Sequence, residues 1–199
     1  GGLRVPRSDL PTPAETVVSA RIGSAKTIEV HAGPASDYAR LFDSPGDDAL
    51  ELTPGAGTLS GSGGTLRLFG FETLEAWSTA GGRDAATMHD SPGNDFLFAL
   101  PGDVRLLGGG YAQQLRGFEE IAVHAGSGGR DLAELHDSAM NDLLEAEALG
   151  CRLTSVEADY THWLTGFRRV RAVSHTGLDT RRVAAGVDYL MTIGSWIDA

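Results

Sequence analysis

One short motif recurs along the chain at a fixed interval, and this repeat limits the possible fold more than any other feature. Each copy begins with Asp-Ser and carries a second aspartate five positions after the first. The first aspartates are Asp43, Asp90 and Asp137, so the interval is 47 residues both times (90 − 43 and 137 − 90). Self-similarity at a period of this size is typical of proteins built from stacked copies of one structural unit.

Other positions follow nearly the same period. A Gly-Phe pair begins at Gly70, Gly117 and Gly166, and a further series of aspartates falls at Asp37, Asp84, Asp131 and Asp179. Leucines recur as Leu50, Leu97, Leu144 and Leu190, as Leu59, Leu106 and Leu153, and as Leu68, Leu115 and Leu164. Within a unit, apolar residues alternate with a spacing of two, which is the period of a strand and not of a helix. Gly, Pro, Asp, Ser or Asn bounds each alternating segment, which indicates short strands between tight turns.

These features predict an all-β fold, a right-handed parallel β-helix or β-solenoid built from about four 47-residue repeats. We expect each unit to form two coils of roughly 23 residues, stacked about 4.8 Å apart. An array of β-hairpins in a sandwich-like arrangement is the alternative fold. The predicted organisation is an extended lead-in (1–16) and one repeat domain (17–199), divided into a partial unit 17–37, units 38–84, 85–131 and 132–179, and a truncated capping unit 180–199.

Composition excludes several partners. The formal net charge of the 199 residues is −11, which disfavours nucleic acid and anionic membrane surfaces as ligands. No apolar run approaches the roughly 18 residues of a membrane-spanning helix, so we expect no membrane insertion. Cys151 is the single cysteine, which excludes an internal disulfide and a cysteine-based metal cluster.

The units resemble a repeat of the form Gly-Phe-Asp … Gly-Gly-x-Asp … Asp-Ser-x-Gly-Asn/Asp-Asp, found in very large secreted or surface proteins of environmental bacteria. The resemblance covers nearly all of residues 24–195. It implies an exported, modular β-solenoid segment at the cell surface or outside the cell, with neighbouring domains of a larger chain as partners. It implies no particular activity. The turn is only distantly like the calcium-binding repeat of β-roll toxins, because the Gly-Gly-x-Gly-x-Asp-x-apolar-x pattern is absent.

The Asp-Ser turns have a structural and a functional interpretation. Asp and Ser side chains bond to nearby backbone amides and stabilise turns, so the motif can be architecture alone. Alternatively, carboxylate oxygens gathered in a tight loop can bind Ca²⁺. The candidate ligands are Asp43, Asp47, Asp48, Asp90, Asp95, Asp137 and Asp142.

Two histidines precede Asp-Ser at equivalent positions, where the first unit has Phe42. His89 and His136 with adjacent carboxylates form a ligand set that suits a transition metal. With two coils per unit, however, they would lie about 9.6 Å apart, twice the strand spacing, which is too far for one shared ion. Aromatic stacking or surface placement is the competing interpretation.

An enzymatic role is the remaining alternative. Many β-helices are polysaccharide lyases or hydrolases, although this is an analogy of fold only. The candidate catalytic residues are Tyr111, Arg116, Tyr160 and His162, the last two in an insertion of the third unit (Val156 to Trp163). The repetition of every conspicuous carboxylate at scaffold positions argues against a unique active site. We therefore expect a non-enzymatic structural or adhesive module, with polysaccharide as a potential partner; a carbohydrate-active enzyme and a dedicated metal-binding domain remain alternatives.

Overall fold

The computed structural model describes residues 27–199, and the predicted lead-in and the first part of the partial unit lie outside them. The described chain is entirely strands and turns. The strands are β1 (Thr27–His31), β2 (Tyr38–Phe42), β3 (Ala49–Thr53), β4 (Ala56–Gly61), β5 (Gly64–Phe69), β6 (Thr73–Trp77), β7 (Ala85–His89), β8 (Phe96–Leu100), β9 (Asp103–Gly108), β10 (Tyr111–Arg116), β11 (Glu120–His124), β12 (Leu132–His136), β13 (Leu143–Glu147), β14 (Gly150–Ser155), β15 (Tyr160–Thr165), β16 (Arg169–Val173), β17 (Thr180–Val183), β18 (Leu190–Ile193) and β19 (Ile197–Asp198). No helix that could cross a membrane occurs in this part of the chain.

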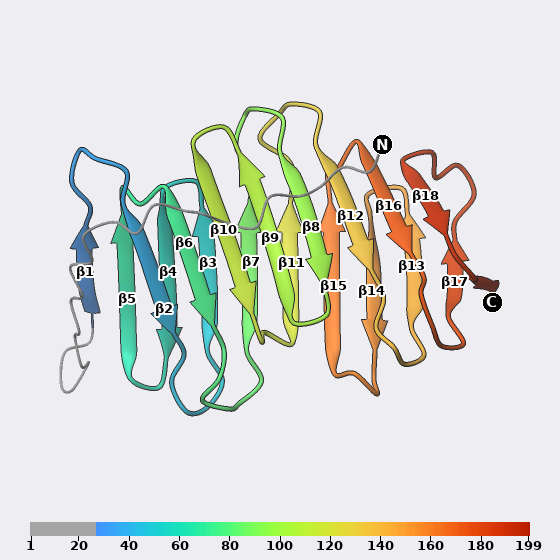
Figure 1. Ribbon diagram of the computed structural model, residues 1–199, viewed down its shortest axis with the longest axis horizontal. Coiled ribbons are helices and arrows are strands. Elements are labelled where there is room, and N and C mark those ends of the chain that lie inside the picture. The colour runs from blue at the N-terminus through green and yellow to red at the C-terminus, as the bar shows by residue number, and fades with distance from the viewer. Residues whose placement is uncertain (1–26) are drawn as a thin grey trace, which may run out of the picture.

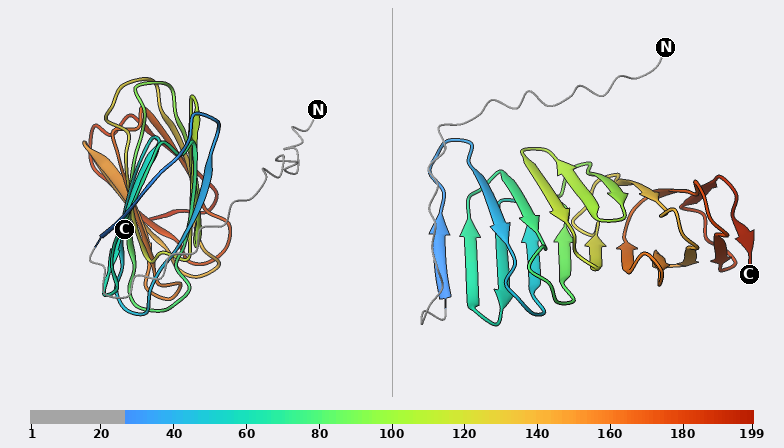
Figure 2. Two further views of the ribbon diagram at one scale, coloured as in Figure 1. Left: turned by 90° about the vertical axis from the view of Figure 1, so that its left-hand side faces the viewer. Right: turned by 60° about the horizontal axis from the view of Figure 1, so that its bottom comes forward.

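Two sheets face each other along the length of the molecule (Figures 1 and 2). The eleven-stranded sheet has the order β1-β5-β4-β3-β7-β11-β15-β14-β13-β17-β19, and the eight-stranded sheet has the order β18-β16-β12-β8-β9-β10-β6-β2. The chain passes repeatedly from one sheet to the other and back, so its strands stack into a β-solenoid. The all-β solenoid prediction is confirmed.

The strand pairing is mixed. Eleven pairs are parallel and stack successive turns of the solenoid. Six pairs are antiparallel and join consecutive strands into three-stranded meanders, β3-β4-β5, β8-β9-β10 and β13-β14-β15. The hairpins of the alternative prediction are therefore present as well, but as insertions within a solenoid.

Each repeat contributes one and a half turns of the solenoid, and not the two coils that the sequence suggested. In a complete unit, for example 85–131, β7 lies in the eleven-stranded sheet, the meander β8-β9-β10 in the eight-stranded sheet, and β11 in the eleven-stranded sheet again. The step to β12, the first strand of the next unit, is the third change of sheet. One turn needs only two changes. Successive units consequently place their meanders in opposite sheets: the first and third meanders lie in the eleven-stranded sheet, the second in the eight-stranded sheet.

The predicted leucine ladders form the core. Leu97, Leu106, Leu144 and Leu153 have no exposed surface, and Leu115 and Leu164 have at most 1%. Burial alternates along single strands, as in β10, where Tyr111, Gln113 and Leu115 point inward. Burial of each of these leucine side chains stabilises the folded state by about 2 kcal/mol.

Candidate functional site

The corners of the solenoid carry its most regular polar feature. Each Asp-Ser turn links a strand of one sheet to a strand of the other. A second loop, which ends in another aspartate and comes later in the chain, packs against it from the neighbouring coil of the solenoid. The contact is the same in every repeat. A backbone amide donates to the Oδ1 atom of an aspartate 36 or 37 residues further on: Asp48 to Asp84 at 2.8 Å, Asp95 to Asp131 at 2.9 Å, and Asp142 to Asp179 at 3.1 Å.

These corners gather three carboxylates each. Within residues 27–199 the triads are Asp43, Asp48 and Asp84; Asp90, Asp95 and Asp131; and Asp137, Asp142 and Asp179. One oxygen from each member lies within 4.8 Å of those of the other two, so each triad could hold a metal ion. All members are buried except Asp43, which is partly exposed.

Six of the seven predicted aspartate ligands belong to the triads. Asp47 does not, because its Oδ1 atom accepts a hydrogen bond from the Arg83 amide at 2.8 Å on the surface. The sequence prediction also missed the third members, Asp84, Asp131 and Asp179. The sequence does contain a signal for these residues, because they recur with nearly the same period as the Asp-Ser turn. Placing them beside it also requires the number of residues in one coil of the solenoid, which the sequence does not reveal.

Hydroxyl groups hold the second aspartate of each Asp-Ser turn. In the middle triad, Ser91 Oγ donates to Asp95 at 3.0 Å, and the hydroxyl of the buried Tyr111 donates to the same carboxylate at 2.8 Å. In the third triad, Ser138 and Tyr160 bond to Asp142 in the same way. The two tyrosines are therefore part of the corners, and their hydroxyl groups hold the second aspartate of the Asp-Ser turn in place.

The middle triad is less satisfied than the other two. Asp90 accepts from one backbone amide, that of Ser127 at 3.0 Å, whereas Asp43 accepts from two. Asp90 Oδ2 has no partner in the described chain although the residue is only 3% exposed, and Asp43 Oδ1 in the first triad is unpartnered as well. Ala125 stands where the other corners have Ser78 and Ser174, whose hydroxyls donate to Asp84 and Asp179. Asp131 thus lacks the serine donor of its counterparts.

The third triad has an additional donor. Its Asp137 accepts from the backbone amide and from Nδ1 of His175, both at 2.7 Å. The three corners therefore share one geometry but differ in how many hydrogen bonds neutralise their charge.

Burial governs the acidity of these carboxyl groups. It raises the pKa of Asp131, and the neighbouring charges of Asp90 and Asp95 raise it further. It also raises the pKa of Asp137, partly offset by hydrogen bonds from His175, and that of Asp142, partly offset by those from Tyr160 and Ser138. A bound cation or a bound proton would relieve the repulsion in each triad.

The histidines form two aromatic pairs, one tilted and one stacked. His89 lies 5.4 Å from His124 between ring centroids, and His136 lies 5.1 Å from His175. His89 is on β7 and His136 on β12, in opposite sheets, so the predicted one-sheet ladder with a 9.6 Å separation is wrong. No cluster of three metal-binding side chains found in the described chain includes a histidine. The aromatic-stacking interpretation fits the observed contacts.

The four candidate catalytic residues form two pairs in opposite sheets, and the rings of Tyr160 and His162 lie 4.9 Å apart. Tyr111 and Arg116 are on β10 in one sheet, and Tyr160 and His162 are on β15 in the other. Arg116 stacks on the ring of Trp77, 4.8 Å from its centroid, and lies 3.5 Å from Glu75. His162 points into the core with 1% of its surface exposed, and neither ring nitrogen has a partner within residues 27–199. The arrangement offers no nucleophile–base pair among the four.

Comparison of this chain with protein-family models, curated proteins and solved structures finds no match.

Proposed function

We propose that this chain is a non-enzymatic structural or adhesive repeat module of an exported bacterial protein, and that Ca²⁺ bound at the aspartate triads stabilises its corners. The observation that supports this proposal is the repeated amide-to-carboxylate bond between successive turns, from Asp48 to Asp84 and at the two equivalent corners. The conspicuous acidic groups stand at scaffold positions that recur with the repeat. The resemblance to repeats of large secreted proteins supports the exported location.

The dimensions of the triads suit calcium. Ca²⁺ binds oxygen at about 2.3–2.6 Å, so two ligands on opposite sides of one ion are about 5 Å apart. The triad oxygens lie within 4.8 Å of one another, which places them within reach of one such ion. The unpartnered Asp90 Oδ2 supplies a second, independent indication, because a buried carboxylate oxygen without a donor is costly unless a cation neutralises it.

Thermal unfolding with Ca²⁺ and with chelator tests the proposal. We expect the Tm of the intact chain to rise with millimolar Ca²⁺ and to fall with EDTA, since an ion that binds only the folded state stabilises it by mass action. Asp131→Asn, which removes one charge from the middle triad, should reduce the rise. Asp47→Asn, which removes a carboxylate outside the triads, is the matched control.

Two results would count against calcium. The first is a Tm that is identical in Ca²⁺ and in EDTA. The second is an equal loss of the calcium response in Asp47→Asn and Asp131→Asn, which would indicate non-specific screening of an acidic chain. Mg²⁺ at the same concentration separates calcium binding from a general effect of divalent charge, because Mg²⁺ dehydrates reluctantly and prefers shorter bonds.

A further inference from the structure

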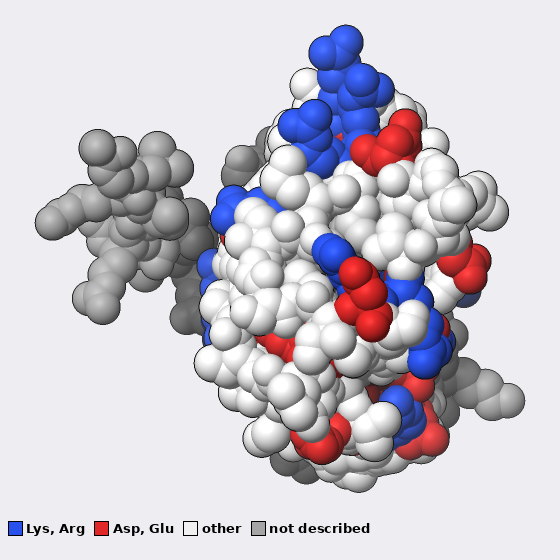
Figure 3. Space-filling view, turned by 90° about the vertical axis from the view of Figure 1, so that its right-hand side faces the viewer, with Lys and Arg blue, Asp and Glu red and all other residues white. Residues whose placement is uncertain are grey.

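A pocket of about 730 Å³ opens where Gly166 turns the chain from β15 to β16, at the upper rim of the solenoid in Figure 1. Its lining includes Arg130, Arg168, Arg169, Phe167, Tyr189 and one carboxylate, that of Asp188. The volume falls within the range typical of small-molecule sites, which is about 300–1,000 Å³. In the end-on view of Figure 3, basic side chains gather at this upper rim.

The arginines of this pocket differ from the others in the described chain. Nine arginines of residues 27–199 form ion pairs with carboxylates: Arg40, Arg67, Arg83, Arg105, Arg116, Arg152, Arg171, Arg181 and Arg182. The remaining three, Arg130, Arg168 and Arg169, form none, and all three line the pocket. Within residues 27–199 of this acidic chain, the arginines without an ion pair thus lie together in one hollow.

The repeats show that this charge is a local departure from the scaffold. The residue after Gly-Phe is Glu72 in the first unit and Glu119 in the second. Each of these glutamates accepts a hydrogen bond from the amide of an aspartate on the neighbouring turn, Asp37 at 2.7 Å and Asp84 at 2.8 Å. In the third unit the same position is Arg168, which cannot accept that bond. A structural acceptor has been replaced by a cation.

The next position changes in the same direction and releases a second arginine. In the second unit Glu120 pairs with Arg83 at 2.8 Å. Their equivalents one unit later are Arg169 and Arg130, which both carry a positive charge and so cannot form this ion pair. Both other repeats have a hydrogen-bonded glutamate at the position of Arg168, while the position of Arg169 is Thr73 in the first and the paired Glu120 in the second. The presence of arginine at both positions in the third repeat points to a ligand that supplies the negative charge.

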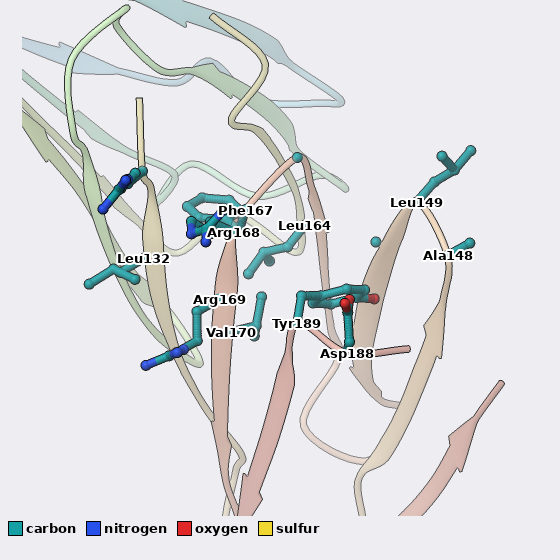
Figure 4. Close-up of a pocket in the computed structure, with 13 residues that line it drawn as sticks. Leu132, Ala148, Leu149, Leu164, Phe167, Arg168, Arg169, Val170, Asp188 and Tyr189 are labelled. Carbon is teal, nitrogen blue, oxygen red and sulfur yellow. The ribbon is translucent and has the colours of Figure 1, made fainter. Parts of the chain in front are cut away.

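We propose that this pocket binds an acidic oligosaccharide, with carboxylate or sulfate groups on the arginines and a sugar ring against Tyr189. Figure 4 shows Tyr189 between Phe167 and Arg168 on one side and Ala148 and Leu149 on the hairpin opposite. Arg169 lies on the Leu132 side with its guanidinium directed away from Tyr189. Arg168 beside Phe167 and Arg169 on the Leu132 side lie at different places around the pocket, which suits an extended ligand with several acidic groups. Planar guanidinium groups bind such oxyanions bidentately.

An extended peptide fits the pocket less well. Peptides commonly bind by adding a strand to an open sheet edge. Beside the pocket, β16 pairs with both β12 and β18, and β15 pairs with both β11 and β14, so neither offers an open edge. An aromatic face flanked by arginines is instead the kind of surface that an acidic sugar contacts.

Titration calorimetry of the intact chain with four probes tests the proposal. The probes are tetragalacturonate, a sulfated tetrasaccharide, neutral maltotetraose and a tetraglutamate peptide. We expect one or both acidic sugars to bind, maltotetraose not to bind, and binding to weaken strongly at about 1 M salt, where the Debye length is about 3 Å. The acidic sugar that binds more tightly identifies the acid group.

The double variant Arg168→Glu/Arg169→Glu restores the residues that the second repeat has at these positions. Because that repeat folds with glutamates there, the variant should keep its stability and lose about tenfold or more in affinity. Arg83→Gln, at the corner equivalent to Arg130, is the control and should bind as the wild type does. Tyr189→Leu should weaken binding of the sugar through loss of ring stacking.

Three outcomes overturn the proposal. Neither acidic sugar binds at about 10 mM, above the weak end of ligand affinities; or binding is unchanged in the folded double variant; or tetraglutamate binds as tightly as the sugars, which would assign the pocket to an acidic peptide. None depends on calcium at the corners, so this proposal and that of the module's stabilisation fail separately.

Discussion

His162 occupies in the third repeat the inward-facing position that Leu66 holds in the first. The imidazole is 1% exposed, and burial lowers its pKa to about 4. In the second repeat the position is Gln113, whose amide also has no partner within residues 27–199. The core therefore tolerates a leucine at this position and carries unsatisfied polar groups in two of its three copies.

We predict that His162→Leu stabilises the chain, and by more in acid. The unfolded histidine takes up a proton near pH 6.5 and the folded one only near 4, so the free energy of unfolding of the wild type decreases as pH falls through this interval. The total decrease in the free energy of unfolding is about 3 kcal/mol. Urea unfolding at several pH values should show the difference between variant and wild type growing by this amount towards acid. A difference independent of pH would contradict the prediction; Gln113→Leu, which removes a group that does not titrate, is the control.

Two adjacent glycines should respond differently to alanine. A Cβ at Gly82 would lie 2.3 Å from the carbonyl oxygen of Gly46 on the neighbouring turn, whereas one at Gly81 meets nothing within 4 Å. Both have positive φ, so Gly81→Ala should cost about 1 kcal/mol from backbone strain alone. Gly82→Ala should cost about 2 kcal/mol more because the stacked corners must separate. Denaturant midpoints at constant m measure both, and equal losses would refute close contact between these turns.

Ala125→Ser should repair the middle corner. Ser78 and Ser174 donate to Asp84 and Asp179 at the equivalent positions, so the new hydroxyl should donate to Asp131. We expect about 1 kcal/mol of added stability in the presence of chelator. Ser174→Ala, the reverse change at the third corner, should lose a similar amount. If both substitutions destabilise the chain, the missing hydroxyl is not what distinguishes the middle triad.

Calcium should stabilise the chain more at neutral pH than in acid. Burial raises the pKa of Asp131, Asp137 and Asp142, so the folded state holds protons that the unfolded state releases. Without calcium, these groups make the chain less stable as pH rises above about 4, the ordinary aspartate value. Calcium must displace those protons, so the Tm gain over EDTA should shrink towards pH 4. Measuring it in His162→Leu removes the opposing histidine effect; a gain that does not change with pH would argue against ligation by these carboxylates.

The sequence predicted the core because burial follows the strand period directly. Leu97 and Leu144 alternate with residues that are less buried, whatever the topology. The number of coils per repeat did not follow, because a 47-residue interval is compatible with several paths. Pro54-Gly55 and Pro101-Gly102 are two-residue connections between antiparallel strands; such pairs are local signals of hairpins, but in the sequence they were outweighed by the long-range period.

A candidate site could be predicted from the sequence when its residues lie close together along the chain. The two aspartates of each Asp-Ser turn are five residues apart, so their proximity was evident from the sequence. The third aspartate is 36 or 37 residues away and joins them only through the stacking of turns. The pocket required more, since Arg130 and Arg168 were conspicuous only once their equivalents, Arg83 and Glu119, were seen to be satisfied by partners.

Because each repeat makes one and a half turns, equivalent positions of successive repeats lie on opposite sides of the solenoid. Adding or deleting one unit ahead of the Gly166 corner would transfer every later meander, and the arginine pocket with it, to the opposite side of the rod. Adding or deleting two units would leave the pocket on its original side. A longer array could therefore change in length by pairs of repeats and keep its binding surfaces aligned, whereas the gain of a single repeat would turn all surfaces beyond it to face the other way.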